Sequence, residues 1–207
     1  MPEKVPLSSN VVNKCAREPR PSMISFTNPF KVRREVNAAH DLYVATIKSA
    51  RDPWLFNDCG VPDTPEGRFE ALTLMAFIVL NRLKDIEGAA GVSQAYFDVM
   101  FEDIDANLRE MGVGEATIAK RMKKLAGSFY GRVKTYDEAL TSDEPSQWPD
   151  TIKRYLFNET EVSEEIVAAV ASFSADIAQN IATQPADNLV AGKITFNGNR
   201  DIINKAT

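Results

Sequence analysis

Three carboxylates in the segment 93–111 are the first side chains that could carry chemistry. Asp98, Glu102 and Asp105 follow an i, i+4, i+7 spacing, which places them on one face of a helix. Carboxylates bind hard cations and act as general acids or bases, so one alternative is an enzyme or a metal-binding helical protein. The simpler interpretation is a solvated face, with Asp105 and Arg109 forming an ion pair one turn apart.

The next segment, residues 115–140, carries the opposite charge. Between positions 118 and 136 the only charged residues are the cations Lys120, Arg121, Lys123, Lys124, Arg132 and Lys134. A helix with such a face can contact RNA phosphates, anionic lipid headgroups or an acidic protein, or it can simply be solvated. A second alternative is therefore an RNA- or membrane-surface adaptor that uses the basic helix 120–134. The net charge of −5 predicts that any basic site is local, and we expect no DNA partner.

Most familiar catalytic and metal-binding motifs are missing from the sequence. His40 is the single histidine, which excludes HExxH zinc sites and paired ExxH di-iron sites. Cys15 and Cys59 form no CxxC motif, and reduced thiols are the simplest expectation. The sequence MGVGE at 111–115 contains a GxG, but it joins two predicted helices instead of following a strand. We therefore expect a chain that is not an enzyme and that uses no cofactor or metal.

These residues lie on segments whose apolar positions recur every three or four residues, which predicts helices. Helices are expected at about 29–50, 63–87, 93–111, 115–140, 149–157 and 163–183, with short ones at 54–59 and after Pro185. The apolar stripe of the first helix is Val32, Val36, Ala39, Tyr43, Ile47 and Ala50. Asp63 and Glu66 resemble a capping box before the second long helix, which is apolar on nearly all sides from 72 to 80. That helix should be central and buried.

The fold class is therefore all-α, with a single domain of about six to eight helices at 29–197. We expect a disordered, flexible tail at 1–28, where prolines interrupt a polar sequence, and a C-terminal tail at 198–207. The longest apolar stretch, 71–80, is about half the roughly 20 residues that a spanning helix needs. With no signal peptide apparent, the sequence predicts a chain that does not cross a membrane.

Three stretches together resemble one known family. They comprise Ala50–Trp54, Gly60–Thr64 and Gly67–Glu70; then Phe97–Asp105 and Leu108–Gly114; then Lys123–Lys124, Phe129–Arg132 and Tyr136–Leu140. In these stretches the sequence is similar to the ubiquinol–cytochrome c chaperone family, the assembly factors of respiratory complex III. The resemblance spans about 40–196. LREMGVG at 108–114, followed by a basic helix and FYGR at 129–132, is its most specific part.

The resemblance implies an all-helical assembly chaperone that binds newly made cytochrome b and promotes assembly of the ubiquinol–cytochrome c reductase. Its partner would be cytochrome b or a complex III assembly intermediate. The resemblance leaves open two further contacts, namely the ribosome near the tunnel exit and the inner membrane. The copy looks bacterial, and the expected location is cytoplasmic, with an option of peripheral binding at the cytoplasmic face of the inner membrane.

Polar and charged side chains lie beside the helix–helix turn at 111–114 in greater number than the helix contacts need, which indicates where a partner could bind. The hypothesis is a partner-binding surface made of Phe101, Asp103, Arg109, Glu110, Lys123, Lys124 and Tyr130.

Overall fold

The computed structural model describes residues 29–158 and 160–200, and this part of the chain is helical with no strand. Its α-helices are α2 (Pro29–Ala50), α3 (Pro65–Lys84), α4 (Ala90–Glu110), α5 (Glu115–Leu140), α6 (Gln147–Ile152), α7 (Glu164–Thr183) and α8 (Ala186–Val190). Two short π-helical segments, η1 (Trp54–Asp58) and η2 (Lys153–Phe157), join the set. The predicted all-α class is confirmed. Residues 1–28, where a disordered tail was predicted, and 201–207 lie outside the described residues, and the division into domain and tails stays a prediction.

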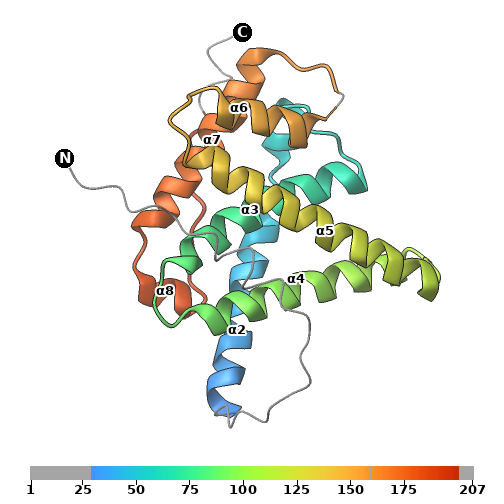
Figure 1. Cartoon of the computed structure of the whole chain (residues 1–207), viewed down its shortest axis with the longest axis vertical. Helices are drawn as coiled ribbons and strands as arrows, with labels where there is room; N and C mark the ends of the chain where they lie inside the picture. Colours follow the sequence, from blue (N-terminus) through green and yellow to red (C-terminus); the bar gives the residue numbers. More distant parts are fainter. Residues whose placement is uncertain (1–28, 159, 201–207) are drawn as a thin grey trace.

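Helix α3 is the centre of the fold, as its sequence predicted. Every residue from Thr73 to Val79 is buried, so no side of that stretch faces solvent. Helices α2, α4, α5 and α7 and segment η2 all pack against it (Figure 1). The remaining helices therefore owe their positions to a single helix that must be covered on all sides.

The start of α3 differs from the prediction by one residue. Thr64 is the N-cap, and its hydroxyl accepts a hydrogen bond of 3.1 Å from the backbone N–H of Gly67. Asp63 was predicted to cap the helix, but its carboxylate instead accepts a 2.5 Å bond from Nε of Arg68. Pro65 then occupies the first helical position, where its missing N–H costs nothing. A Cβ on Gly67 would lie 2.0 Å from the Pro62 carbonyl oxygen, so only glycine fits there.

The predicted apolar stripe of α2 is wrong at its first two positions. Val32 and Val36 are 42% and 44% exposed, whereas burial begins at Ala38 and Ala39. The N-terminal turns of α2 extend beyond the helices that cover the rest of it (Figure 1). Periodicity identified the face correctly, but it does not indicate how far along a helix the neighbouring helices reach.

Buried polar contacts join helices that are distant in sequence. Glu70 on α3 and Arg132 on α5 form a bidentate ion pair at the α3–α5 contact. Burial raises the pKa of the Glu70 carboxyl, and the Arg132 guanidinium opposes this. On α2 and α4, the buried Tyr96 hydroxyl donates a 2.8 Å bond to Oγ1 of Thr46. These bonds satisfy groups that would destabilise the core if left unpaired.

The structure bears on the predictions of reduced thiols and of a chain that does not cross a membrane. Cys59 is a free, buried thiol, and burial raises its pKa to about 12. Cys15 lies outside the described residues. Helix α7 is long and apolar enough to cross a membrane by length and composition alone, yet 44% of that window is buried inside the structure. Its Val170, Phe173 and Ile177 belong to the core, as expected for a helix that packs on α3.

The Glu70–Arg132 pair gives a stability prediction. Arg132→Met should lower the free energy of unfolding by about 3 kcal/mol at pH 7, because it leaves a largely buried carboxylate without its partner. The double variant Glu70→Gln/Arg132→Met should recover more than half of that loss. Urea denaturation of the three proteins measures both values.

The same variant has a defined pH dependence. Without Arg132, the folded pKa of Glu70 lies still further above its unfolded value. The variant is therefore relatively most stable below about pH 4 and loses stability as the pH rises through the folded pKa. A deficit that is equal at pH 4 and pH 7 would contradict a buried, charge-dependent pair.

Candidate protein-interaction site

Helices α4 and α5 run antiparallel, and their joined ends extend away from the other helices (Figure 1). The pair of segments 97–114 and 115–130 is called the arm below. At its tip, Gly112 has a φ of +74°, and Val113 N–H bonds the carbonyl of Leu108 at 3.2 Å. Gly112 N–H bonds the carbonyl of Arg109 at 2.9 Å, which completes a Schellman motif. Gly112 therefore reverses the chain within the sequence MGVGE, which was predicted to join two helices.

Arg109 holds the two sides of the tip together. Its guanidinium bonds Asp105 on α4 at 2.6 Å and also bonds Glu115 at the start of α5. The predicted Asp105–Arg109 pair is confirmed, and the bond to Glu115 adds a link across the turn. Because the pairs are exposed, they set geometry more than they stabilise the fold.

Four rings from both helices pack together at the root of the arm. This aromatic cluster consists of Phe97, Phe101, Phe129 and Tyr130. Phe97 stacks on Tyr130 at 5.5 Å between ring centroids and lies 4.5 Å from Phe101. Phe129 is 2% exposed, but the other three rings are only half-buried. The cluster therefore closes the α4–α5 contact and also presents apolar surface.

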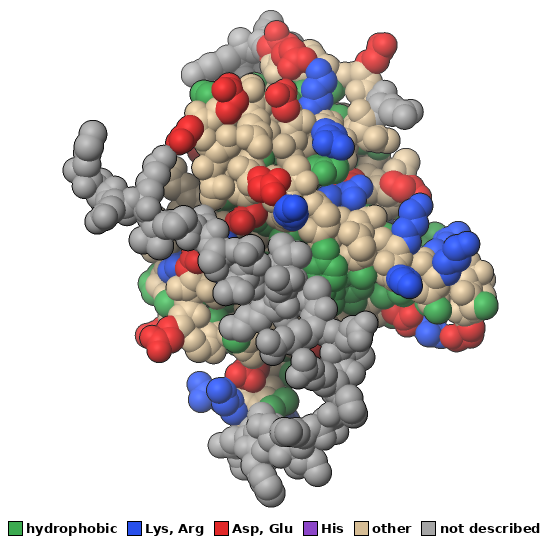
Figure 2. Space-filling view, in the orientation of Figure 1, with side chains coloured by type: hydrophobic (Ala, Val, Ile, Leu, Met, Phe, Trp, Pro, Cys, Tyr) green, Lys and Arg blue, Asp and Glu red, His purple; other side chains and the backbone are tan. Residues whose placement is uncertain are grey.

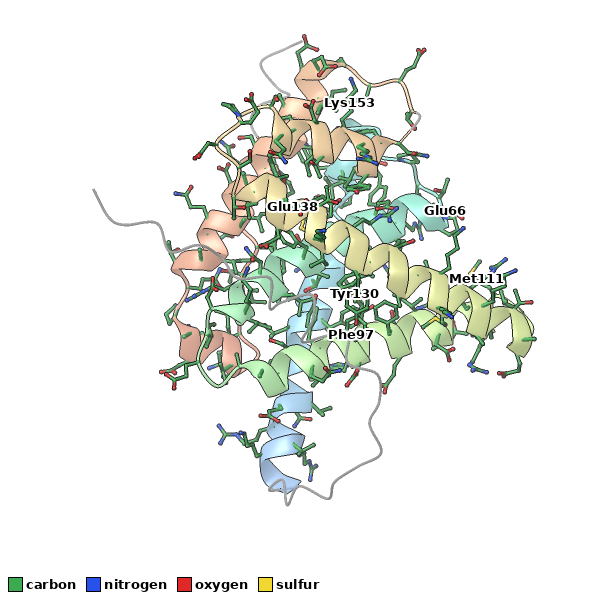
Figure 3. All side chains as sticks on the ribbon, in the orientation of Figure 1. Glu66, Phe97, Met111, Tyr130, Glu138 and Lys153 are labelled. Carbon is green, nitrogen blue, oxygen red and sulfur yellow. The ribbon has the colours of Figure 1, made fainter. Side chains whose placement is uncertain are left out.

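The arm carries apolar surface at its root and basic side chains toward its outer end (Figure 2). Figure 3 shows Phe97 and Tyr130 lying together between α4 and α5. In the same orientation, Figure 2 shows hydrophobic surface at that place and Lys and Arg side chains over the outer end of the arm. An apolar area thus adjoins a basic one on a part of the chain that projects from the body.

Asp103 links the arm to α2. Its carboxylate accepts a 2.8 Å hydrogen bond from the hydroxyl of Tyr43, which lies 60 residues earlier in the sequence. Burial and this bond raise the pKa of Tyr43 above its ordinary value. Tyr43 also meets Tyr96 edge-on at 6.0 Å. Asp103 therefore positions α4 on α2.

The seven residues predicted for partner binding all lie on the arm, but they differ in their surroundings. Phe101 and Tyr130 belong to the aromatic cluster, and Asp103 and Arg109 make the contacts described above. The remaining three residues, Glu110, Lys123 and Lys124, are exposed. Neither lysine forms an ion pair with another residue in the described ranges. A role of these seven residues in binding stays a prediction.

Two residues of this surface, Phe97 and Met111, were not predicted from the sequence. Phe97 was not among the residues predicted for partner binding, although its ring is only half-buried. Met111 was not among them either, and at the tip it is 63% exposed. A large apolar residue directly before a glycine turn is a signal that could have identified Met111 as exposed.

The exposed basic face of α5 lacks one of the predicted cations, Arg132. Lys120, Arg121, Lys123 and Lys124 are exposed near the outer end of the arm. Arg132 was counted with them, but it turns inward to Glu70 and lies over the ring of Tyr155 at 4.9 Å. Spacing could not indicate this, because the buried carboxylate that attracts Arg132 comes from α3.

The acidic residues of α4 share one face as predicted, beside an open groove of about 650 Å³. Asp105 is paired with Arg109, and Asp98 accepts a 2.9 Å bond from the amide of Gln94. Within residues 29–158 and 160–200, no three His, Cys, Asp or Glu side chains are placed so that they could hold a metal ion together. His40 is exposed on α2, far along the chain from these carboxylates.

Comparison with known proteins identifies the class of this helical chain. Residues 57–196, more than half of the chain and including the entire arm, match the family model described as ubiquinol-cytochrome C chaperone. The chain belongs to that family, as the resemblance in its sequence predicted.

Individual relatives agree with the family assignment. Ubiquinol-cytochrome-c reductase complex assembly factor 1 of Xenopus laevis is 29% identical over 125 residues, which cover 58% of this chain and 62% of that protein. The Mus musculus protein of the same name is also 29% identical over 125 residues, 58% of this chain and 42% of the relative. The chain thus matches less than two thirds of the length of these relatives. The crystal structure of the Cbp3 homolog from Brucella abortus superimposes with a TM-score of 0.72 and 29% identity, covering 81% of this chain and 93% of that one.

Truncating a buried ring of the aromatic cluster should cost more stability than truncating a partly exposed one. Phe129→Ala should lower the free energy of unfolding by about 3–5 kcal/mol, because it leaves a cavity between α4 and α5. Phe101→Ala should cost only about 1–2 kcal/mol, because water can reach the vacated space. Urea denaturation followed by circular dichroism measures both. Equal losses would show that Phe101 is packed as tightly as Phe129 and that the cluster is closed.

Proposed function

We propose that this chain is an assembly chaperone that binds newly made cytochrome b and promotes assembly of the ubiquinol–cytochrome c reductase, complex III. The observation that carries the proposal is the half-buried aromatic cluster on a projecting arm, inside the region that matches the chaperone family. The names of the frog and mouse relatives support the assembly role.

The physical argument starts from the client. A membrane protein exposes apolar segments before it reaches its final partners, and exposed apolar surface drives aggregation in water. Phe97, Phe101 and Tyr130 offer apolar area that is already held in place by Phe129, so little side-chain freedom is lost when a client segment covers them. Holding rather than transforming the client requires no catalytic group.

The basic end of the arm supports a second element of the proposal. Lys120, Arg121, Lys123 and Lys124 form an exposed cationic area near the tip. Such an area attracts anionic lipid headgroups or ribosomal RNA within about 8 Å at physiological salt. We therefore propose a cytoplasmic protein that works at the cytoplasmic face of the inner membrane or near the ribosomal tunnel exit.

Deletion of the gene tests the assembly role. Assembled cytochrome b, measured by its haem absorbance and by native gels of complex III, should fall while other respiratory complexes persist. Reintroduction of the wild-type chain should restore it. Normal complex III in the deletion strain would rule out the proposed function.

Charge reversal tests the part played by the basic area. Lys123→Glu/Lys124→Glu should fail to restore complex III fully but should leave the melting temperature nearly unchanged, because both side chains are exposed. The matched control is Lys48→Glu/Lys193→Glu, which makes the same change in net charge at exposed positions on α2 and after α8. Equal complementation by the two variants would show that Lys123 and Lys124 have no special role.

Sedimentation with liposomes and with ribosomes tests the proposed location. The chain should bind vesicles that contain anionic lipid, or ribosomes, at low salt and should be released as the salt concentration rises. Lys123→Glu/Lys124→Glu should weaken the binding and Lys48→Glu/Lys193→Glu should not. Binding that is equally strong to neutral vesicles and insensitive to salt would contradict an electrostatic contact.

A further inference from the structure

An open groove runs along the arm between α4 and α5, from the aromatic cluster at its root toward the tip. It encloses about 650 Å³. Its lining residues are Asp98, Phe101, Glu102, Asp105, Arg109, Glu115, Ile118, Ala119 and Met122. Phe101, Ile118 and Met122 make its floor apolar. Because Phe101 also belongs to the aromatic cluster, the groove is continuous with that surface.

The rim of the groove is strongly acidic. The four carboxylates around it face a single cation, Arg109, whose guanidinium is already bonded to Asp105 and Glu115. The remaining two, Asp98 and Glu102, form no ion pair with any residue that the structure describes. Asp98 only accepts a bond from the neutral amide of Gln94. An apolar floor therefore lies beside negative charge that the chain itself does not neutralise.

We propose that this groove binds an amphipathic segment of a partner protein, with apolar side chains on the floor and Lys or Arg side chains against Asp98 and Glu102. Charge complementarity favours a basic protein segment as the occupant of the groove, because the acidic rim would repel anionic lipid or RNA. From Asp98 to Arg109 the helix rises about 16 Å, which corresponds to about three turns of a docked helix. The inference rests on the proposed function in one respect, namely that the arm is where a partner protein binds.

One competing occupant comes from the chain itself. The exposed cations of α5 in a second copy could meet the acidic rim of the first. Such a contact would give a dimer that dissociates at high salt. The two occupants differ in stoichiometry, so sedimentation of the free protein distinguishes them.

The test measures binding of a defined probe to the full chain. The probe is a fluorescein-labelled helical peptide of about three to four turns, with Leu on one face and Lys on the other. Fluorescence anisotropy should show saturable binding that weakens with added salt. Asp98→Lys/Glu102→Lys should weaken binding about tenfold or more, a change of about 1.4 kcal/mol or more. Both positions are exposed, so the fold should tolerate the change.

The matched control is Glu87→Lys/Glu161→Lys, which alters net charge equally at exposed positions away from the arm. It should bind the probe within about twofold of wild type, because the long-range contribution of net charge is screened. A second probe, with Gln in place of Leu, should bind much more weakly if the apolar floor contributes.

Three results would overturn the inference. Equal weakening by the two charge-reversal variants would show attraction by net charge alone. Equal binding of the Leu and Gln probes would show an acidic surface without a groove contact. A salt-sensitive dimer that Asp98→Lys/Glu102→Lys abolishes would make a second copy the occupant. None of these depends on complex III, so a normal deletion strain would reject the proposed function without deciding this test.

Discussion

The structure depends on covering α3. The stretch from Thr73 to Val79 has no exposed side, so the chain must surround it with α2, α4, α5 and α7. Each of these helices presents apolar or small side chains where it meets α3. The fold therefore follows from the need to keep one apolar helix out of water. The ion pair of Glu70 with Arg132 and the bond of Tyr43 to Asp103 then fix α5 and α4 in register around the core.

The arm is what remains when α4 and α5 run beyond the reach of α3. There they bury apolar side chains mainly against each other and at the edge of the core, and this contact does not enclose all of them. Phe129 is covered, while Phe97, Phe101 and Tyr130 are only partly buried. The Schellman turn and Arg109 keep the two helices paired in this position. The same geometry leaves these rings partly uncovered, and they form the surface that we propose for the client.

The sequence predicted the helices well, because their boundaries depend on local signals. Gly112 ends one helix, Ser163 caps another through the N–H of Ile166, and the bounds of α5 agree with its predicted span. The central position of α3 followed from its composition. The cap of α3 was misplaced because Asp63 and Thr64 are both good capping residues, and the choice depended on Arg68 pairing with Asp63.

Predictions of the site were limited by contacts between distant segments. Asp103 looked like surplus surface charge until Tyr43 was placed against it, and Arg132 looked like part of the basic face until Glu70 was. Neither partner can be deduced from spacing along one helix. The exposure of Val32, Val36 and Met111 had the same origin, because periodicity defines a face but not the extent of its cover.

The central claim is that the aromatic cluster of the arm holds newly made cytochrome b. The most direct measurement places the photo-cross-linking residue benzoylphenylalanine at position 101, with position 168 on the exposed side of α7 as the control. Cells are pulse-labelled and irradiated, and cytochrome b is recovered by immunoprecipitation. The account predicts a labelled cytochrome b adduct from position 101 that is absent from position 168 and decays during a chase. No adduct from position 101, or equal adducts from both positions, would contradict it.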